Sequence, residues 1–328
     1  MFADIDHQYR TIASRAGWFG RAGHGVVRVD GPDRLTFLHA LLTNDTMSLA
    51  EGRGVAAAYL TPQGRMLADV EVLNRGDHVL VLVAPAAAAA LASRLDGIIF
   101  AEQVSVTDTS RDWTETVVTG ATAAAVAAEA SGAETDALDP LGELEHVAIE
   151  GGFVVRGGES PLPLFRLMVA PGARARIEQR LQALDVPELA PELVTALRIE
   201  AGRPRWAVDL FEDTIPLEAG LLERAISTSK GCYVGQEVII RVLHRGGGRV
   251  ARRLVQLALP AGGTDVPAAG TPIAYNAEVA GRITSAAWSP ARHAVLALGY
   301  VHRDAATVGT IVGVGGAGTP AEIVGFAR

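Results

Sequence analysis

The order of strand and helix patterns in the first hundred residues constrains the fold more than any other feature of this sequence. Apolar runs bounded by turn residues predict strands at 26–29, 55–60, 66–73 and 79–83. After the first strand, Leu35, Leu38 and Leu42 recur at helical spacing, and after the last one Pro85 begins an alanine-rich helix. The order β-α-β-β-β-α favours an α+β layer with an antiparallel sheet over a doubly wound parallel sheet.

The rest of the chain predicts two further units. Strand patterns at 152–156 and 164–169 precede a helix at 173–184, so a second α+β region begins near residue 110. From about residue 252, short β-rich runs separated by Gly, Pro and Asn are typical of a small β-barrel or sandwich. Because 328 residues exceed what one core usually supports, we expect three domains. Their expected bounds are 1–108, 109–245 and 246–328.

Charge and composition exclude several classes of function. The formal net charge is −8 and no long basic block occurs, so binding to duplex DNA is disfavoured, although a local basic groove is compatible with the sequence. The sequence has neither the long apolar run of a membrane-spanning helix nor a first segment that resembles a secretory signal. One cysteine fits a reducing compartment, and no metal-binding or phosphate-binding motif is present. We expect a cytoplasmic monomer without a metal.

The octapeptide around the single cysteine is the first candidate for chemistry. It consists of Lys230, Gly231, Cys232, Tyr233, Val234, Gly235, Gln236 and Glu237. A lone thiol can neither close an internal disulfide nor hold a structural zinc ion by itself. Polar, glycine-containing surroundings with a nearby lysine are typical of reactive thiols, and a helix beginning after Gly235 would also favour the thiolate. The alternatives are a half-buried cysteine in a turn and, for 238–242, a strand in place of a helix.

A second candidate is Glu200, in the segment Arg198-Ile199-Glu200-Ala201-Gly202. Pro191 begins a helix that Gly202 ends, which puts Glu200 in its last turn, where the helix dipole disfavours a carboxylate. A ligand role would explain this position, although the residues alone favour the alternative. The alternative is an ion pair with a neighbouring arginine.

A third candidate is the arginine cluster that surrounds a run of three glycines. Its members are Arg241, Arg245, Arg249, Arg252 and Arg253. Arginines beside exposed backbone amides suit carboxylates or phosphates. A solvated linker between domains has the same composition, and the residues alone do not separate the two.

The octapeptide resembles the K-G-C-[FY]-x-G-Q-E signature of the YgfZ family of folate-binding proteins, relatives of the glycine-cleavage T-protein. The resemblance extends along nearly the whole chain, and its other segments are Gly31 with Phe37-Leu38, then 43–45, 61–65, 198–202, 215–220, 281–285 and 298–301. It implies an aminomethyltransferase-like fold of three domains around a central opening that binds tetrahydrofolate.

The resemblance also implies roles for individual residues. It makes Glu200 the anchor of the pterin, whose ring N–H and amine suit the two oxygens of a carboxylate. It implies a catalytic aspartate in the helix after the strand at 79–83, where this chain has the run Ala86 to Ala90. Conventional aminomethyl transfer is therefore in doubt on sequence grounds.

The leading hypothesis is a tetrahydrofolate-binding protein that assists assembly or repair of iron-sulfur clusters in client proteins. Cys232 and Lys230 would act at the reactive centre, and Arg241, Arg249 and Arg252 would meet the acidic tail of the folate. The alternative is a folate-dependent enzyme that transfers an aminomethyl or methyl group or demethylates an amine. A binding module for modified RNA is a third possibility, which the net charge disfavours.

Overall fold

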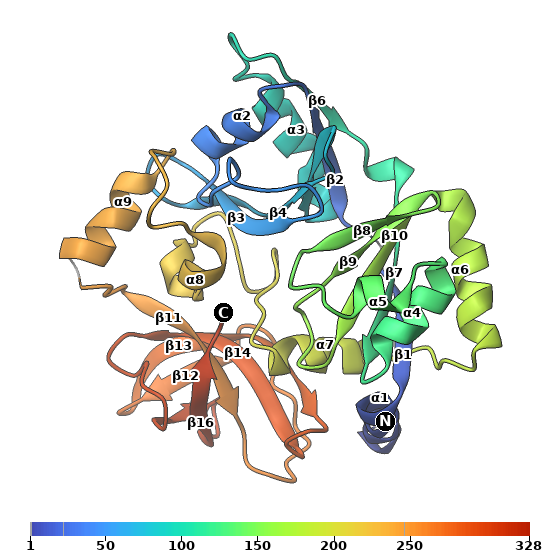
Figure 1. Cartoon of the computed structure of the whole chain (residues 1–328). Helices are drawn as coiled ribbons and strands as arrows, with labels where there is room; N and C mark the ends of the chain where they lie inside the picture. Colours follow the sequence, from blue (N-terminus) through green and yellow to red (C-terminus); the bar gives the residue numbers. More distant parts are fainter. Residues whose placement is uncertain (1, 22, 246) are drawn as a thin grey trace.

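The computed structural model describes residues 2–21, 23–245 and 247–328. Its strands form two five-stranded sheets and one closed barrel, arranged around a common centre (Figure 1). All strand pairs within the sheets and the barrel are antiparallel. This confirms the α+β class and the C-terminal barrel that the sequence predicts.

The first sheet has the order β3-β4-β5-β2-β6. Its elements are β2 (Gly25–Asp30), α2 (Arg34–Leu41), β3 (Gly54–Leu60), β4 (Met66–Asn74), β5 (His78–Val83), a 3-10 turn (Pro85–Ala87), α3 (Ala88–Asp96) and β6 (Ser105–Asp108). Apolar side chains of β4 such as Ala68, Val70 and Val72 are buried against a core that includes Leu38 and Leu91 of the two helices. The intervening residues of β4 therefore face the opposite side of the sheet.

The second sheet has the order β1-β7-β10-β9-β8. Its elements are α1 (Phe2–Ser14), β1 (Ala16–Arg21), β7 (Thr114–Gly120), α4 (Ala123–Ser131), α5 (Thr135–Leu138), β8 (His146–Ile149), β9 (Gly152–Arg156), β10 (Leu164–Val169) and α6 (Pro171–Ala183), with a 3-10 turn at Ser110–Asp112. β1 lies in the first expected domain, yet it pairs with β7 from Ala16 opposite Gly120. A boundary at residue 108 would thus separate two strands that are hydrogen-bonded to each other.

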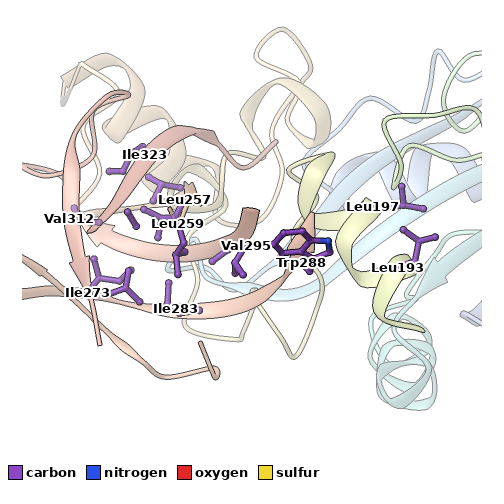
Figure 2. Close-up of a cluster of buried hydrophobic side chains, with 14 of the residues drawn as sticks. Leu193, Leu197, Leu257, Leu259, Ile273, Ile283, Trp288, Val295, Val312 and Ile323 are labelled. Carbon is purple, nitrogen blue, oxygen red and sulfur yellow. The ribbon is translucent and has the colours of Figure 1, made fainter. Parts of the chain in front are cut away.

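The segment between the second sheet and the barrel contains short helices and turns. They are α7 (Pro191–Glu200), a 3-10 turn (Pro216–Ala219), α8 (Leu222–Ala225), α9 (Gln236–Ile240) and a π-helical turn (Arg241–Arg245). α7 packs on the barrel strand β13, and its Leu193 and Leu197 belong to the same hydrophobic cluster as Trp288 and the barrel interior (Figure 2). α7 thereby joins the second sheet to the barrel.

The barrel closes in the order β11-β14-β13-β12-β15-β16. Its strands are β11 (Arg252–Ala258), β12 (Pro272–Tyr275), β13 (Glu278–Ser289), β14 (Ala294–His302), β15 (Ile311–Val314) and β16 (Thr319–Phe326). Residues such as Leu257, Ile273, Ile283, Val295 and Ile323 fill its interior (Figure 2). The barrel is therefore a packed core and does not enclose a ligand channel.

Candidate functional site

A cavity of about 720 Å³ lies between the two sheets and the segment that begins with α7. Its wall includes residues 19–21 of β1, 23–24, 69–71 of β4, 82–85 at the end of β5 and just after it, Glu159, one side of α7, the loop 203–206 and Arg224. Apolar side chains such as Phe19, Leu82 and Leu189 alternate with charged ones. A concave, mixed wall of this volume is typical of a small-molecule site.

Asp69 of β4 is a cavity carboxyl whose pKa is raised toward neutrality. It alternates along the strand with Ala68 and Val70, which face the helices, so Asp69 and Glu71 face the cavity. Burial raises the pKa of Asp69 from its usual 3.8 to about 6, although Arg224 and nearby cations act in the opposite direction. A carboxyl with a pKa near neutrality can both give and take a proton.

A buried ionic network lies beside Asp69. The fully buried Arg166 of β10 places Nη1 2.6 Å from Glu71 Oε2 and 3.8 Å from Glu159 Oε1. Arg21 Nη1 lies 3.2 Å from both Glu115 Oε1 and Glu159 Oε1. Burial opposes the charge of Arg166, but the surrounding carboxylates outweigh it and raise the pKa of this guanidinium.

Glu115 of β7 is the most deeply buried carboxylate of this network. Its Oε2 lies 2.8 Å from His24 Nδ1, and its side chain is inaccessible to solvent. Burial pushes the pKa of Glu115 upward, but the charges of His24 and Arg21 outweigh it and hold the pKa at about 2. The network therefore keeps Glu115 ionised close to Asp69, a carboxyl whose pKa lies much nearer to neutrality.

Glu200 lies at the end of α7, as predicted, but it is not among the residues that form the described wall of the cavity. Its Oε1 accepts a 2.6 Å hydrogen bond from Ser289 of β13, and its buried Oε2 has no partner among the described residues. Burial raises the pKa of Glu200. The carboxyl therefore faces the barrel, because successive residues of a helix point in different directions.

Lys230 uses its ammonium group to fasten the cysteine loop to the end of α2. Nζ donates to the backbone carbonyls of His39, Leu42 (2.6 Å) and Asn44 (3.2 Å). Burial lowers the pKa of Lys230 to about 8. With three carbonyl partners, the ammonium caps the last turn of α2, an arrangement that helix ends favour.

Other residues of the octapeptide also attach this loop to the first sheet. Tyr233 is buried, and a side chain at Gly235, whose φ is +83°, would lie 2.5 Å from the carbonyl oxygen of Thr61 in the β3–β4 turn. The helix α9 begins at Gln236, as one of the two sequence alternatives predicts. Gly231 and Cys232 remain exposed, and neither belongs to the described cavity wall.

The predicted arginines do not lie together with Glu200 or at the cavity wall as described. Arg241 pairs with Glu237 at 2.5 Å within α9 and the following turn, and Arg249 is exposed. Arg252 bonds Glu218 at 2.9 Å and stacks over the ring of Tyr300 at 4.6 Å. The cavity instead uses other arginines, namely Arg21, Arg198, Arg203, Arg205 and Arg224.

Sequence reasoning missed Asp69, Glu71 and Arg166. Asp69 and Glu71 are two residues apart, and the strand residues directly beside them are apolar. This spacing, which puts both carboxyls on one face of the strand, was the available signal. No group of three or more His, Cys, Asp or Glu in the described part of the chain is arranged to hold a metal ion. Nor do the described residues include a helix with the length and apolarity needed to cross a membrane.

The family comparisons agree with this architecture. The model of the GCVT N-terminal domain matches residues 1–154, and that of the glycine cleavage T-protein C-terminal barrel domain matches residues 252–326. Residues 1–154 and 252–326 therefore match domains of the T-protein class. It is homologous to the aminomethyltransferase, or T-protein, superfamily.

Several named proteins are similar to most of this chain. An aminomethyltransferase of Synechocystis sp. is 26% identical over 94% of this chain and 83% of its own length, and one of Rubrobacter xylanophilus is 28% identical over 92% and 80%. A chloroplastic protein of Arabidopsis thaliana that bears a transferase name is 28% identical over 89% of this chain, which spans 66% of that protein. The crystal structure of aminomethyltransferase T from Bartonella henselae has the same fold, with a TM-score of 0.87, 22% identity, and coverage of 98% of this chain and 88% of that one.

Glu200→Gln is expected to leave the affinity for tetrahydrofolate within about twofold, because its carboxyl bonds Ser289 and lies outside the described cavity wall. Because burial raises its pKa, the ionised form destabilises the fold above the pH at which it titrates. The variant should therefore unfold at a higher temperature than the wild type at pH 8. Calorimetry with tetrahydrofolate and thermal scans measure both effects, and a clear loss of affinity would restore the pterin role predicted from sequence.

Proposed function

We propose that this protein binds tetrahydrofolate, or a derivative, in the cavity between the two sheets and acts on a one-carbon unit. The observation that carries the proposal is Asp69, a cavity carboxyl whose pKa is raised to about 6. The names of its relatives, aminomethyltransferases, support the same class of chemistry.

The residues of the cavity fit a folate. Its volume of about 720 Å³ lies within the range usual for ligands of this size. Glu159 lines the cavity, and its buried Oε2 has no partner among the described residues, so it can accept from the ring N–H and amine of a pterin. Trp206 and Phe19 provide aromatic surface in the same wall.

Asp69 gives this cavity the means for proton transfer. Bound tetrahydrofolate would supply the amine nitrogens that carry the one-carbon unit. Near neutral pH Asp69 is present in both ionisation states, so it can hold a proton at its carboxyl or release it to an adjacent amine. The run Ala86 to Ala90 therefore does not leave the cavity without an acid, since β4 provides one.

The direct test uses the purified full-length protein. Calorimetry should show saturable binding of tetrahydrofolate, and an aminomethylated amine should yield a folate-bound one-carbon unit, followed by the absorbance of the product. Binding without turnover would support a folate-binding helper protein, whereas the absence of binding would reject the folate site itself.

The second candidate function is the YgfZ-type role in assembly or repair of iron-sulfur clusters. The observation that favours it is Cys232, which is exposed on a loop that Lys230, Tyr233 and Gly235 attach to the first sheet. A fixed, exposed thiol outside the cavity wall suits contact with a partner protein. The clients would be proteins that contain iron-sulfur clusters.

Cys232→Ser is expected to leave tetrahydrofolate affinity unchanged and to abolish rescue of cluster-enzyme activity in a strain that lacks this gene. Serine preserves the size of the side chain but not the thiolate. Thr228→Ala, which alters another exposed residue of the same loop, is the matched control and should rescue fully. Complete rescue by the serine variant would remove the thiol from this function.

A further inference from the structure

Arg198 of α7 is a buried cation whose hydrogen bonds are incomplete. The residue is 7% exposed and lines the cavity between the sheets. Nη1 donates to Asp209 Oδ2 and to the carbonyl oxygen of Arg203, both at 2.7 Å. Nε and Nη2 are buried and have no partner among the described residues. These two nitrogens form one edge of the guanidinium group, the edge that binds a carboxylate through two parallel hydrogen bonds.

Asp209 cannot satisfy this edge. Its carboxylate is fully buried, and each oxygen already accepts two hydrogen bonds. Oδ2 accepts from Arg198 and from the backbone N–H of Arg205 (3.0 Å), while Oδ1 accepts from Thr284 (2.5 Å) and Ser285 (2.8 Å). The ion pair therefore holds Arg198 in place through one nitrogen only. A buried donor edge without an acceptor is costly, and a ligand that supplies one removes that cost.

A second positively charged side chain in the cavity wall also favours the binding of an anion beside Arg198. Arg205 also lines the cavity, and it is exposed. Burial lowers the pKa of Arg198, Asp209 raises it, and the positive charge of Arg205 lowers it again. The guanidinium groups of Arg198 and Arg205 thus repel each other, and the carboxylate of Asp209 balances only the charge of Arg198. A further carboxylate between them would be bound favourably.

We propose that Arg198 and Arg205 form a carboxylate-binding subsite of the cavity, in which the unpartnered edge of Arg198 holds the ligand and Arg205 closes the site toward solvent. The inference rests on the proposed folate function for the identity of the ligand. Two ligands of that function have a carboxylate: the glutamate tail of tetrahydrofolate, and an amino acid that bears a one-carbon group on its nitrogen.

The test compares three probes by calorimetry on the full-length protein: tetrahydrofolate, tetrahydropteroate, which lacks the glutamate, and N-methylglycine. Arg205→Gln and Arg198→Lys are the variants. Arg205 is exposed, so its replacement should not disturb folding, and lysine keeps the charge at Arg198 but not the two-point edge. Arg94→Gln removes an equal charge from the exposed face of α3 and is the control.

We expect each variant to lower the affinity for one of the probes that carry a carboxylate about tenfold, while Arg94→Gln leaves all affinities unchanged. If the variants bind tetrahydrofolate more weakly but tetrahydropteroate equally well, the subsite holds the glutamate tail of the folate. If the variants bind N-methylglycine more weakly, the subsite holds a separate amino-acid substrate. Equal affinities of tetrahydrofolate and tetrahydropteroate, with N-methylglycine binding unaffected by both variants, would reject the subsite and leave the folate function standing. Failure of all three probes to bind would reject both.

Discussion

Asp69→Asn is expected to lower one-carbon turnover at least about a hundredfold, because the amide cannot exchange a proton at neutral pH. Tetrahydrofolate affinity should change only a few-fold, since the amide keeps the size of the side chain and one acceptor. In the wild type, the pH dependence of turnover should show an apparent pKa of about 6, the value that burial gives to Asp69. That inflection should disappear from the residual activity of the variant.

Although Asp69→Asn should lose activity, it should gain stability at neutral pH. The pKa of Asp69 is raised from 3.8 to about 6 in the folded chain, so the folded state binds the proton more tightly than the unfolded state. This stabilises the protonated fold, and the free energy of unfolding falls as the pH rises from about 4 to 6. The loss at pH 7 is at most about 3 kcal/mol. Asn at this position does not titrate, so the variant should be more stable than the wild type at pH 7.

Asp96→Asn is the matched control for both measurements, because Asp96 is exposed at the end of α3 and lies outside the described cavity wall. It should alter neither turnover nor the pH dependence of urea unfolding. Turnover by Asp69→Asn at the level of the wild type would exclude Asp69 from the chemistry.

Arg166→Met is expected to destabilise the fold by about 3–5 kcal/mol, the usual cost of leaving buried carboxylates without their counter-ion. Arg166 is inaccessible to solvent and lies between Glu71 and Glu159, whose charges would then repel each other. Methionine fills most of the volume, so the loss would reflect charge more than packing. Urea unfolding at pH 7 measures the difference.

Arg174→Met provides the comparison on the surface. Arg174 pairs with Glu178 one helical turn away at 2.7 Å, and both side chains are partly exposed. Such a pair contributes less than about 1 kcal/mol. If Arg166→Met were as mild as this control, the network beside the cavity would not depend on its central cation. Adding Glu71→Gln to Arg166→Met should recover part of the lost stability, because it removes one unpaired charge.

Most of the fold follows from local patterns in the sequence. Strands with alternating or continuous apolar residues, such as 164–169, and helices that begin at proline, such as α7, have the predicted bounds within a few residues. β1 was not predicted, because Gly17 and Gly20 weaken its strand pattern. In the fold these glycines allow close approach, since a side chain at Gly17 would lie 2.5 Å from Leu189 Cδ2.

The candidate site was harder to predict than the fold. The octapeptide drew attention to Cys232, yet its lysine, tyrosine and second glycine serve mainly to attach the loop to the first sheet. Asp69 and Arg166 resemble ordinary outward-facing residues of half-buried strands when each strand is considered alone. The charge of a residue does not reveal whether a second sheet will cover it.

The sequence by itself determined the class of each unit, the antiparallel first sheet and the final barrel, because these depend on periodicity and turn residues within short segments. Tertiary structure decided which carboxyls face the cavity. Asp69, Glu71 and Glu159 come together with Arg166 only when β4 of the first sheet faces β10 of the second. The same packing reduces the access of water to Asp69 and moves its pKa toward neutrality, an effect that depends mainly on what surrounds the group in the folded chain.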